Sequence, residues 1–381
     1  MKKVLCVILA MVMVFALAAC GNGGAPAPAN TPDPGDAAPS TSPDTPASPP
    51  ASPPSGGGDT SPDAPGSGQA WNPDNIREQV FVMAHGLPAT GMTGLQYNEF
   101  AVAIEELSGG KMTVEQRIGG TLLLDTETLE GVMMGTVDFV HNLTSFASGT
   151  VTNVSPLSMP GYYAGDDWFG FLDNSRDILT EIYAEYGVKY LGSVSQGYTA
   201  IVCTEKQIRS PSDVAGLSMR ASGTWISKCV EAWGGAATML GLADLPDALQ
   251  RRIVQGTMAG LVIVVPFQLH EIAEYVTFTT MAETFGALLM SGSRWDELNA
   301  DERALIVEAT KIFEQNSYDL AQEFKETYVA EIENSGLNQT HILTQAEQKL
   351  FTDIVKQMFD EMAPELGPSG LKLIELLKEA S

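Results

Sequence analysis

A change of composition near residue 70 divides the chain into a part that cannot fold and a part that can. Residues 21–70 are almost entirely Gly, Ala, Pro, Ser, Thr, Asp and Asn, without any Leu, Ile, Val or aromatic side chain. Such a segment buries too little apolar surface to offset the entropy of ordering, so it is predicted to be a disordered, partly polyproline stalk. A coil of about 50 residues reaches roughly 40 Å. We assign the stalk to residues 21–78 and expect the functional residues from about Trp71 onward.

The first twenty residues are typical of an export signal. Two lysines, Lys2 and Lys3, precede an apolar run from Val4 to Ala16. The run is shorter than the about 20 apolar residues that span a bilayer. It ends in Leu17-Ala18-Ala19-Cys20, which resembles a bacterial lipobox, in which the cysteine becomes the lipidated first residue of the mature chain. We predict a lipoprotein signal peptide at residues 1–20, lipidation at Cys20, and a location on the outer face of the cytoplasmic membrane, at the cell surface or in the periplasm. An ordinary signal peptide is the alternative.

Length and net charge limit the number of domains in the chain and the kinds of partner that it can bind. At about 150 residues per domain, 381 residues suggest two domains. Lys and Arg number 21 and Asp and Glu number 47, which gives a formal net charge of −26. This charge repels phosphate backbones, so a nucleic acid partner is excluded. The histidines are scattered without the His-x-x-x-His spacing of a zinc helix, so we predict neither a metal site nor a cofactor.

Strands and helices alternate from Val80 onward. Short apolar runs predict strands and helical spacing predicts helices in the order β-α-β-α-β, at residues 80–83, 100–107, 113–115, 129–135 and 137–140. This order implies a mainly parallel sheet with helices on both faces. Ligands of such sheets bind beyond the carboxyl ends of the strands, so the loops after Met83 and Val140 are candidate binding loops.

A second alternating unit begins near Val188 and continues to Cys203. The run Ser210–Asp213 predicts a helix start, because Ser caps, Pro suits the first helical position and Asp closes a capping box. The strand Leu217–Arg220 follows, with Ser218 and Arg220 on one face. A permanent cation is thereby expected at the carboxyl end of a buried strand. Two cysteines remain in this part, Cys203 and Cys229, and their spacing leaves a disulfide or two buried thiols open.

The C-terminal region is predicted to be helical. Asn299–Glu302 forms a capping box that opens a helix to about Asn334. At 1.5 Å per residue this helix is roughly 50 Å long, more than the width of one small domain, so we expect it to run across both lobes of the protein. Further helices are predicted at residues 345–362 and 371–377.

The chain lacks the motifs of common enzymes. It contains no Gly-x-Ser-x-Gly elbow, and Ser108–Met112 lacks both the upstream glycine and the Ser or Thr of a phosphate-binding loop. Nothing in the sequence pairs a nucleophile with a base. We therefore predict that the protein is not an enzyme.

A series of short motifs follows one another from about Val80 to the C-terminus. They are Glu105–Lys111, Gly120–Leu122, Glu130–Asp138, Leu157–Pro160, Ser210–Arg220, Ala248–Gln250 with Gly256, and Trp295–Leu298. Each motif is weak alone, but their order and spacing over roughly 300 residues is specific. In these motifs the chain resembles the extracytoplasmic solute receptors of TRAP transporters, the DctP-type substrate-binding proteins.

The resemblance implies an α/β, two-lobed periplasmic-binding-protein-like (type II) fold with a hinge and a long bridging helix. Lobe I would comprise residues 79–197 plus about 283–320, and lobe II residues 198–282 plus about 321–381. In the family, the arginine that matches Arg220 forms a bidentate salt bridge with the ligand carboxylate. A planar, always charged fork of donors suits that role. The alternative for Arg220 is a structural ion pair.

At several positions the chain departs from the family pattern, and these departures indicate which ligand the pocket would bind. Where some receptors carry a second arginine, this chain has Tyr198–Ala200, and where several have an asparagine it has Ala259. The pocket is therefore expected to be less polar than that of a sugar-acid receptor, and to suit one carboxylate with an apolar or aromatic body. Besides Arg220, the candidate ligand-binding residues are His85, Thr144, Ser222, Thr224, Trp225, Leu242 and Phe267. Each could instead be a core or turn residue.

These inferences predict a lipid-anchored solute receptor that binds a small organic acid and delivers it to the membrane subunits of a TRAP-type permease. Two other classes remain open at this stage. One is a surface-anchored hydrolase, and the other is a solute receptor of an ABC importer or of a sensor system.

Overall fold

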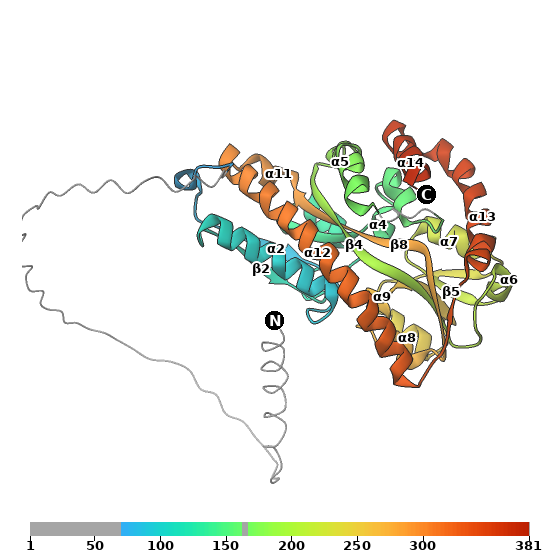
Figure 1. The fold of residues 1–381 in the computed structure, drawn as a ribbon. Helices are drawn as coiled ribbons and strands as arrows, with labels where there is room; N and C mark the ends of the chain where they lie inside the picture. The colour runs from blue at the N-terminus through green and yellow to red at the C-terminus, as the bar shows by residue number, and fades with distance from the viewer. Residues whose placement is uncertain (1–69, 162–166, 381) are drawn as a thin grey trace, which may run out of the picture. The chain divides into compact units, whose positions relative to one another are not determined.

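A single mixed β-sheet runs through residues 70–161 and 167–380, the part of the chain that the computed structural model describes (Figure 1). The order of its strands is β2-β1-β3-β8-β4-β7-β5-β6, and β9 pairs with β8. The strands are β1 (Gln79–Ala84), β2 (Met112–Arg117), β3 (Phe139–Leu143), β4 (Val188–Cys203), β5 (Ser218–Ala221), β6 (Ala236–Met239), β7 (Gly256–Gly260), β8 (Tyr275–Ser291) and β9 (Gln339–Ile342). The signal peptide, Cys20 and nearly all of the predicted stalk lie outside the described residues.

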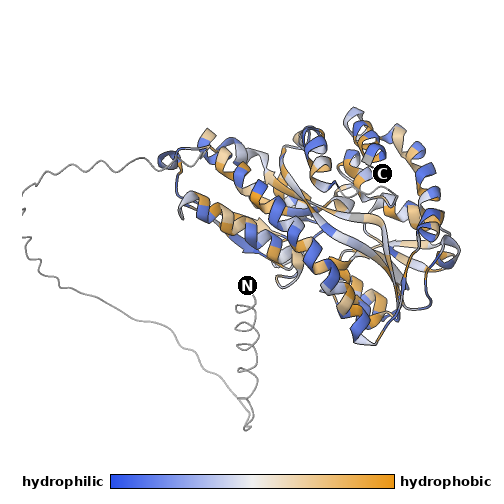
Figure 2. Ribbon diagram, viewed as in Figure 1, coloured by the Kyte–Doolittle hydropathy of each residue, from blue (hydrophilic) through white to orange (hydrophobic). Residues whose placement is uncertain are grey.

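Helices cover both sides of this sheet (Figure 1). The α-helices of eight or more residues are α2 (Met92–Ser108), α5 (Trp168–Ala184), α7 (Thr224–Ala232), α12 (Ala300–Ser335), α13 (Gln345–Met362) and α14 (Pro368–Ala380). The shorter ones are α3 (Thr128–Met133), α4 (Thr144–Ala147), α6 (Pro211–Val214), α8 (Leu245–Gln250), α9 (Leu261–Val264), α10 (Leu269–Ile272) and α11 (Gly292–Asp296), with 3-10 turns η1 (Pro73–Asn75), η2 (Thr152–Ser158) and η3 (Ala363–Glu365). Polar and apolar residues intermingle along the long helices, as expected for helices that pack on one face (Figure 2).

The predicted β-α alternation is confirmed at both ends of the sheet. β1 is parallel to β2 and β3, and β5 is parallel to β6 and β7. The centre of the sheet differs from the prediction, because β3, β8, β4 and β7 are joined by three successive antiparallel pairings. Three reversals make β3 and β7 run in opposite directions. The two groups are also offset along the long strands, because β3 pairs with β8 between Gly286 and Met290 and β7 pairs with β4 between Thr199 and Cys203. Their carboxyl ends therefore face each other across the middle of the sheet.

The two central strands are long and locally irregular. The region from Val188 to Cys203 is one continuous strand, β4, which pairs with β8 along most of its length. Its register shifts between Ser195 and Thr199, next to Gly197 at φ 72°. A shift of this kind inserts extra residues and bends the strand. The bend lies between the two groups of parallel strands.

The long helix α12 joins the two ends of the sheet, as the sequence predicts. It begins at the expected capping box, in which Asn299 and Glu302 bond reciprocally. Its first half contributes Leu305 and Phe313 to the core around β1, α2 and β3. Its second half contributes Tyr328 and Ile332 to the core around β7 and α9. One rigid element thus packs on both parallel groups.

The folded part begins earlier than residue 79, which corrects the predicted end of the stalk. Trp71 and Ile76 are buried in the same core as β1 and α2. The Arg77 guanidinium pairs with Glu302 of α12, with Nη2 and Oε2 2.5 Å apart. The composition of this segment is polar overall, but two apolar side chains and one ion pair are enough to attach it to the core. The described fold therefore includes Trp71 and the residues after it, which the predicted boundary at residue 78 left out.

The C-terminal helix and the cysteines complete the fold. α14 lies against α5 and η2, where Lys372 pairs with Glu181 at 3.5 Å and the Gly367 N–H donates to Asn153. Glu181 and Asn153 belong to predicted lobe I, so the packing of α14 differs from its predicted place in lobe II. Cys203 and Cys229 are buried and unbridged. Burial raises the pKa of the Cys229 thiol to about 12.

A buried carboxylate fastens the middle of α12 to the sheet. Glu314 accepts hydrogen bonds from Arg176 of α5 at 2.8 Å and from the Ser193 N–H of β4 at 3.1 Å. Burial raises the pKa of Glu314, and the positive charge of Arg176 opposes this effect. An uncharged side chain here would leave Arg176 without its partner.

We expect Glu314→Gln to lower the free energy of unfolding by about 1–3 kcal/mol, because a charged hydrogen bond inside the protein is lost. Urea denaturation measures the change. Glu308→Gln is the matched control on the same helix, since Glu308 lies at the surface in an i,i+3 pair with Lys311 and should change the value by less than about 0.5 kcal/mol. Equal effects of the two substitutions would contradict the structural role of Glu314.

Candidate functional site

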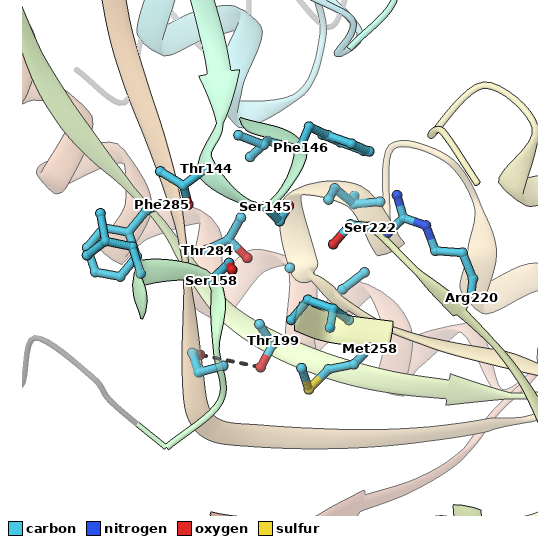
Figure 3. Close-up of a pocket in the computed structure, with 17 residues that line it drawn as sticks. Thr144, Ser145, Phe146, Ser158, Thr199, Arg220, Ser222, Met258, Thr284 and Phe285 are labelled. Atoms are coloured by element: carbon cyan, nitrogen blue, oxygen red, sulfur yellow. Dashed lines mark hydrogen bonds between the residues drawn. The ribbon is translucent and has the colours of Figure 1, made fainter. Parts of the chain in front are cut away.

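A cavity lies where the carboxyl ends of β3, β5 and β7 meet the central strands (Figure 3). The space inside it that the centre of a water molecule can occupy is about 50 Å³. Its lining consists of residues 143–146 from the end of β3, 157–158 from η2, 199 from β4, 220 and 222 from the end of β5, 226 from α7, 258–260 from β7, 263 from α9, and 282 and 284–285 from β8. Ligands of open α/β sheets bind at such strand ends.

Arg220 is the most unusual residue of this lining. Its side chain is buried, with 2% of the residue exposed, and its Nε donates to the Leu240 carbonyl at 2.9 Å. Its Nη2 is buried without any hydrogen-bond partner. The guanidinium also lies over the ring of Phe146, 5.5 Å from the ring centre. A buried cation with an unused donor group is costly unless another molecule completes its bonds.

The electrostatics of the cavity favour an anion. Burial lowers the pKa of Arg220 to about 10, and the carboxylate of Asp125 opposes this effect, so the guanidinium stays protonated at neutral pH. Among the described residues that line the cavity, Arg220 alone carries a formal charge. Hydroxyl groups supply further donors, from Thr144, Ser145, Ser158, Thr199, Ser222 and Thr284.

Apolar side chains form the rest of the wall. They are Leu143, Phe146, Leu157, Ile226, Met258, Ile263 and Phe285. A single cation, several hydroxyl groups and an apolar wall form a site for a small molecule that has one anionic end and an apolar body. The arrangement holds no nucleophile next to a base, within the described residues of the lining.

Three of the predicted ligand-binding residues lie in this lining, namely Arg220, Thr144 and Ser222. Thr144 and Ser222 are found where the sequence indicates strand ends. Residues that the sequence analysis did not single out include Phe146, Met258 and Phe285. Phe146 follows Thr144 by two positions and could have been inferred. Phe285 lies within a long strand, and no sequence pattern marks which of its side chains faces the cavity.

Thr224 and Trp225 lie outside the lining, although they follow Ser222 closely. Gly223 passes so near the chain after β3 that a Cβ on it would collide with the Ser145 carbonyl oxygen. Helix α7 then begins, with Thr224 exposed and Trp225 turned into the core. The Lys228 ammonium covers the Trp225 ring at 3.6 Å. Of the three predicted residues that follow β5, only Ser222 therefore reaches the cavity.

Leu242 and Phe267 also lie outside the lining. Both belong to the apolar core around β7, α8 and α9, where Leu242 is buried and Phe267 is half-buried.

His85 lies in a buried polar cluster in the part of the sheet that consists of β2, β1 and β3. Its ring is close to those of Tyr97 and His141, with ring centres 5.7 and 6.4 Å away. Neither ring nitrogen of His85 has a hydrogen-bond partner. Burial lowers the pKa of His85 to about 4, and the Leu87 carbonyl opposes this effect. Burial likewise holds the pKa of His141 well below its usual value. Both histidines are therefore neutral in the folded protein at pH 7.

We expect these histidines to make the fold sensitive to acid. In the unfolded chain a histidine takes up a proton below about pH 6.5, whereas folded His85 does so only near pH 4. Between these values the unfolded state binds more protons, so stability falls as the pH falls, by about 1 kcal/mol per pH unit for one such group. His85→Gln should remove about 2 kcal/mol of the loss between pH 7.5 and 5.0 in urea denaturation. His341→Gln, at a half-buried position beside Glu347, is the control; an unchanged loss in His85→Gln would exclude His85 as its source.

The comparison with known families decides what kind of protein carries this cavity. The model of the family "bacterial extracellular solute-binding protein, family 7", named DctP, matches residues 83–365. The chain belongs to the DctP family. The members of this family are extracytoplasmic solute receptors, not enzymes, which confirms the family and the absence of catalysis inferred from the sequence. No described helix is both long enough and apolar enough to cross a bilayer.

Relatives of this DctP-family chain include two proteins that are named for binding C4-dicarboxylates. The C4-dicarboxylate-binding periplasmic protein DctP of Rhodobacter capsulatus is 21% identical over 73% of this chain and 84% of the relative. The C4-dicarboxylate-binding protein DctB of Bacillus subtilis is 20% identical over 81% of this chain and 89% of the relative.

Solved structures confirm the fold. The ectoine-binding protein of the TeaABC TRAP transporter of Halomonas elongata has a TM-score of 0.75 at 18% identity, over 79% of this chain and 99% of that one. The Bordetella pertussis receptor DctP7, which binds pyroglutamic acid, has a TM-score of 0.72 at 16% identity, over 79% and 99%. This chain therefore has the two-lobed, type II periplasmic-binding fold of TRAP receptors, as the sequence predicts.

Proposed function

We propose that this DctP-family receptor is lipid-anchored at Cys20, captures a small organic acid with one carboxylate and an apolar or aromatic body, and delivers it to the membrane subunits of a TRAP-type permease. The lipobox-like Leu17–Cys20 supports the anchor. The permease partner follows from the family.

The observation that carries the ligand class is the buried, unused Nη2 of Arg220 at the cavity wall. A carboxylate has two oxygens that accept from a planar guanidinium in parallel, and such charge-assisted bonds are strongest where water is excluded. Arg220 has one bond to the protein, through Nε, which holds its plane in place. The remaining donors are then free for a ligand.

Two features of the cavity support the proposed charge and the proposed apolar body of the ligand. One charged residue in the described lining suits one carboxylate, and Phe146, Met258 and Phe285 suit an apolar body. Related TRAP receptors have been solved with succinate and with pyroglutamic acid, which are small organic acids. The small space of about 50 Å³ favours a compact ligand.

We propose that capture occurs by hinge closure between lobe I and lobe II. The irregular register of β4 near Gly197 supplies a bend in a strand that belongs to both lobes. Leu87, Met92 and Leu143 share an apolar core with residues of α8 and α9, which supports a closed conformation for the described structure. A ligand shifts such an equilibrium by its greater affinity for the closed form.

We expect Arg220→Gln to abolish ligand binding without harming the fold. A thermal-shift screen of the chain from residue 21 onward, against monocarboxylates, dicarboxylates, sugars and amino acids, identifies the ligand class. A ligand at 100 times its Kd stabilises the wild type by about 2.7 kcal/mol. In Arg220→Gln the affinity should fall by about 100-fold or more, because a buried charge pair with the ligand is lost.

Arg251→Gln is the matched control for charge, because Arg251 is exposed and pairs with nearby Asp247 in α8. It should bind as the wild type does. Stabilisation by a sugar or an amine but by no carboxylate, or an unchanged response of Arg220→Gln, would contradict the proposed ligand class.

We expect Cys20→Ser to release the protein from the membrane fraction of the expressing cell. The physical reason is that the lipid chains bury many methylene groups, each worth about 0.8 kcal/mol in the bilayer. Cys6→Ser is the matched control, since Cys6 lies within the predicted signal peptide. Fractionation and labelling with radioactive palmitate measure both. A Cys20→Ser protein that takes up the palmitate label as the wild type does would exclude this anchor.

A further inference from the structure

A second buried charge, the carboxylate of Asp125, lies within electrostatic reach of Arg220. Asp125 belongs to the connection between β2 and α3, and 8% of the residue is exposed. It is not among the residues that line the cavity. Its Oδ2 accepts the backbone N–H of Leu242 at 3.3 Å. Leu242 lies in the connection between β6 and α8, at the opposite end of the sheet. Asp125 thus connects the two parallel groups of strands.

Asp125 and Arg220 hold the same short segment of backbone. Arg220 donates to the carbonyl of Leu240, and Asp125 accepts from the N–H of Leu242. The two charges attract each other but form no direct ion pair within 4.0 Å among the described residues. The attraction lowers the pKa of Asp125 against the larger rise that burial causes. Arg220 therefore has a distant counter-charge and keeps its donors unused.

The surrounding backbone leaves room for this carboxylate. A Cβ on Gly86 would lie 2.8 Å from the Asp125 Cβ and backbone nitrogen, so the chain after β1 passes directly over Asp125. A Cβ on Gly241 would lie 3.9 Å from its Oδ2. Two glycines enclose the carboxylate between two connections that come from opposite ends of the sheet.

We propose that Asp125 is a specificity-determining residue that restricts the ligand to a single negative charge. This inference rests on the proposed binding of a carboxylate to Arg220. Asp125 already offsets part of the positive charge of Arg220 when the site is empty. A first ligand carboxylate gains direct hydrogen bonds to Arg220, whereas a second one has no cation in the described lining and is repelled by Asp125. Because Asp125 is buried, solvent screens this repulsion little.

The test compares dicarboxylates with their monoamides, which have nearly the same shape and one charge less. The pairs are succinate and succinamate, glutarate and glutaramate, and terephthalate and its monoamide. Calorimetric titration of the chain from residue 21 onward gives the ratio of the two Kd values in each pair. We expect the wild type to bind each monoamide at least about tenfold more tightly than the diacid, since one buried unpaired charge is avoided.

Asp125→Asn removes the charge and retains an oxygen that accepts the Leu242 N–H. It should lower the selectivity for the monoamide by about tenfold, mainly by improving the affinity for the diacid. Asp247→Asn is the matched control, because Asp247 is exposed in α8, carries the same charge and pairs with Arg251 at the surface. The control should leave the ratio unchanged.

Two results would overturn the proposed role of Asp125 without contradicting the proposed function. One is a wild type that binds diacids as tightly as their monoamides, and the other is a loss of affinity for both members of a pair in Asp125→Asn, which would make Asp125 a residue that merely positions Arg220. If neither these compounds nor any other carboxylate of the thermal-shift panel binds the wild type, the proposed function itself fails, and the assignment of Asp125 fails with it.

Discussion

Antiparallel pairing of β4 with β8 is the constraint on which the rest of the structure depends. The pair runs from Val188 opposite Ser291 to Cys203 opposite Tyr275, so both ends of the sheet share two strands. β3 adds to β8 and β7 adds to β4, again antiparallel. This series of reversals turns the carboxyl ends of two parallel groups toward each other. A binding site between them needs no special loop, because each group would by itself place ligands at those strand ends.

The second constraint is the cost of keeping a cation away from water. Arg220 lies near the carboxyl end of β5, and burial alone would make its charge unfavourable. The structure offsets this cost in part, through the Leu240 carbonyl and the distant carboxylate of Asp125, and leaves Nη2 without a partner. If the guanidinium made all its hydrogen bonds to protein groups, no donor would remain for an anionic ligand. In the proposed function, the incomplete hydrogen bonding of Arg220 is the feature that selects an anionic ligand.

Much of the fold could be predicted because its signals are local. The capping boxes at Ser210, Asn299 and Thr344 are all formed, and each starts a helix where the sequence indicates one. The antiparallel centre could not be predicted in the same way. Strand direction depends on which distant segments pair, and apolar runs at Val188 and Thr199 do not tell whether they are two strands or one.

The candidate site also has a part that local sequence predicts and a part that only long-range packing decides. The sequence by itself determined the chemical type of the site, since Arg220 at a strand end needs only the alternation of one short strand and a side chain that is always charged. Thr144 and Ser222 follow from the same rule for strand ends. Tertiary structure alone decided which other side chains join them. The close approach of Gly223 to Ser145 turns Trp225 into the core, β8 brings in Phe285, and Asp125 comes to Arg220 from the opposite end of the sheet. Contacts of this kind join segments that are far apart in the sequence, such as Asp125 and Leu242, and their partners are selected by packing, which no local sequence pattern predicts.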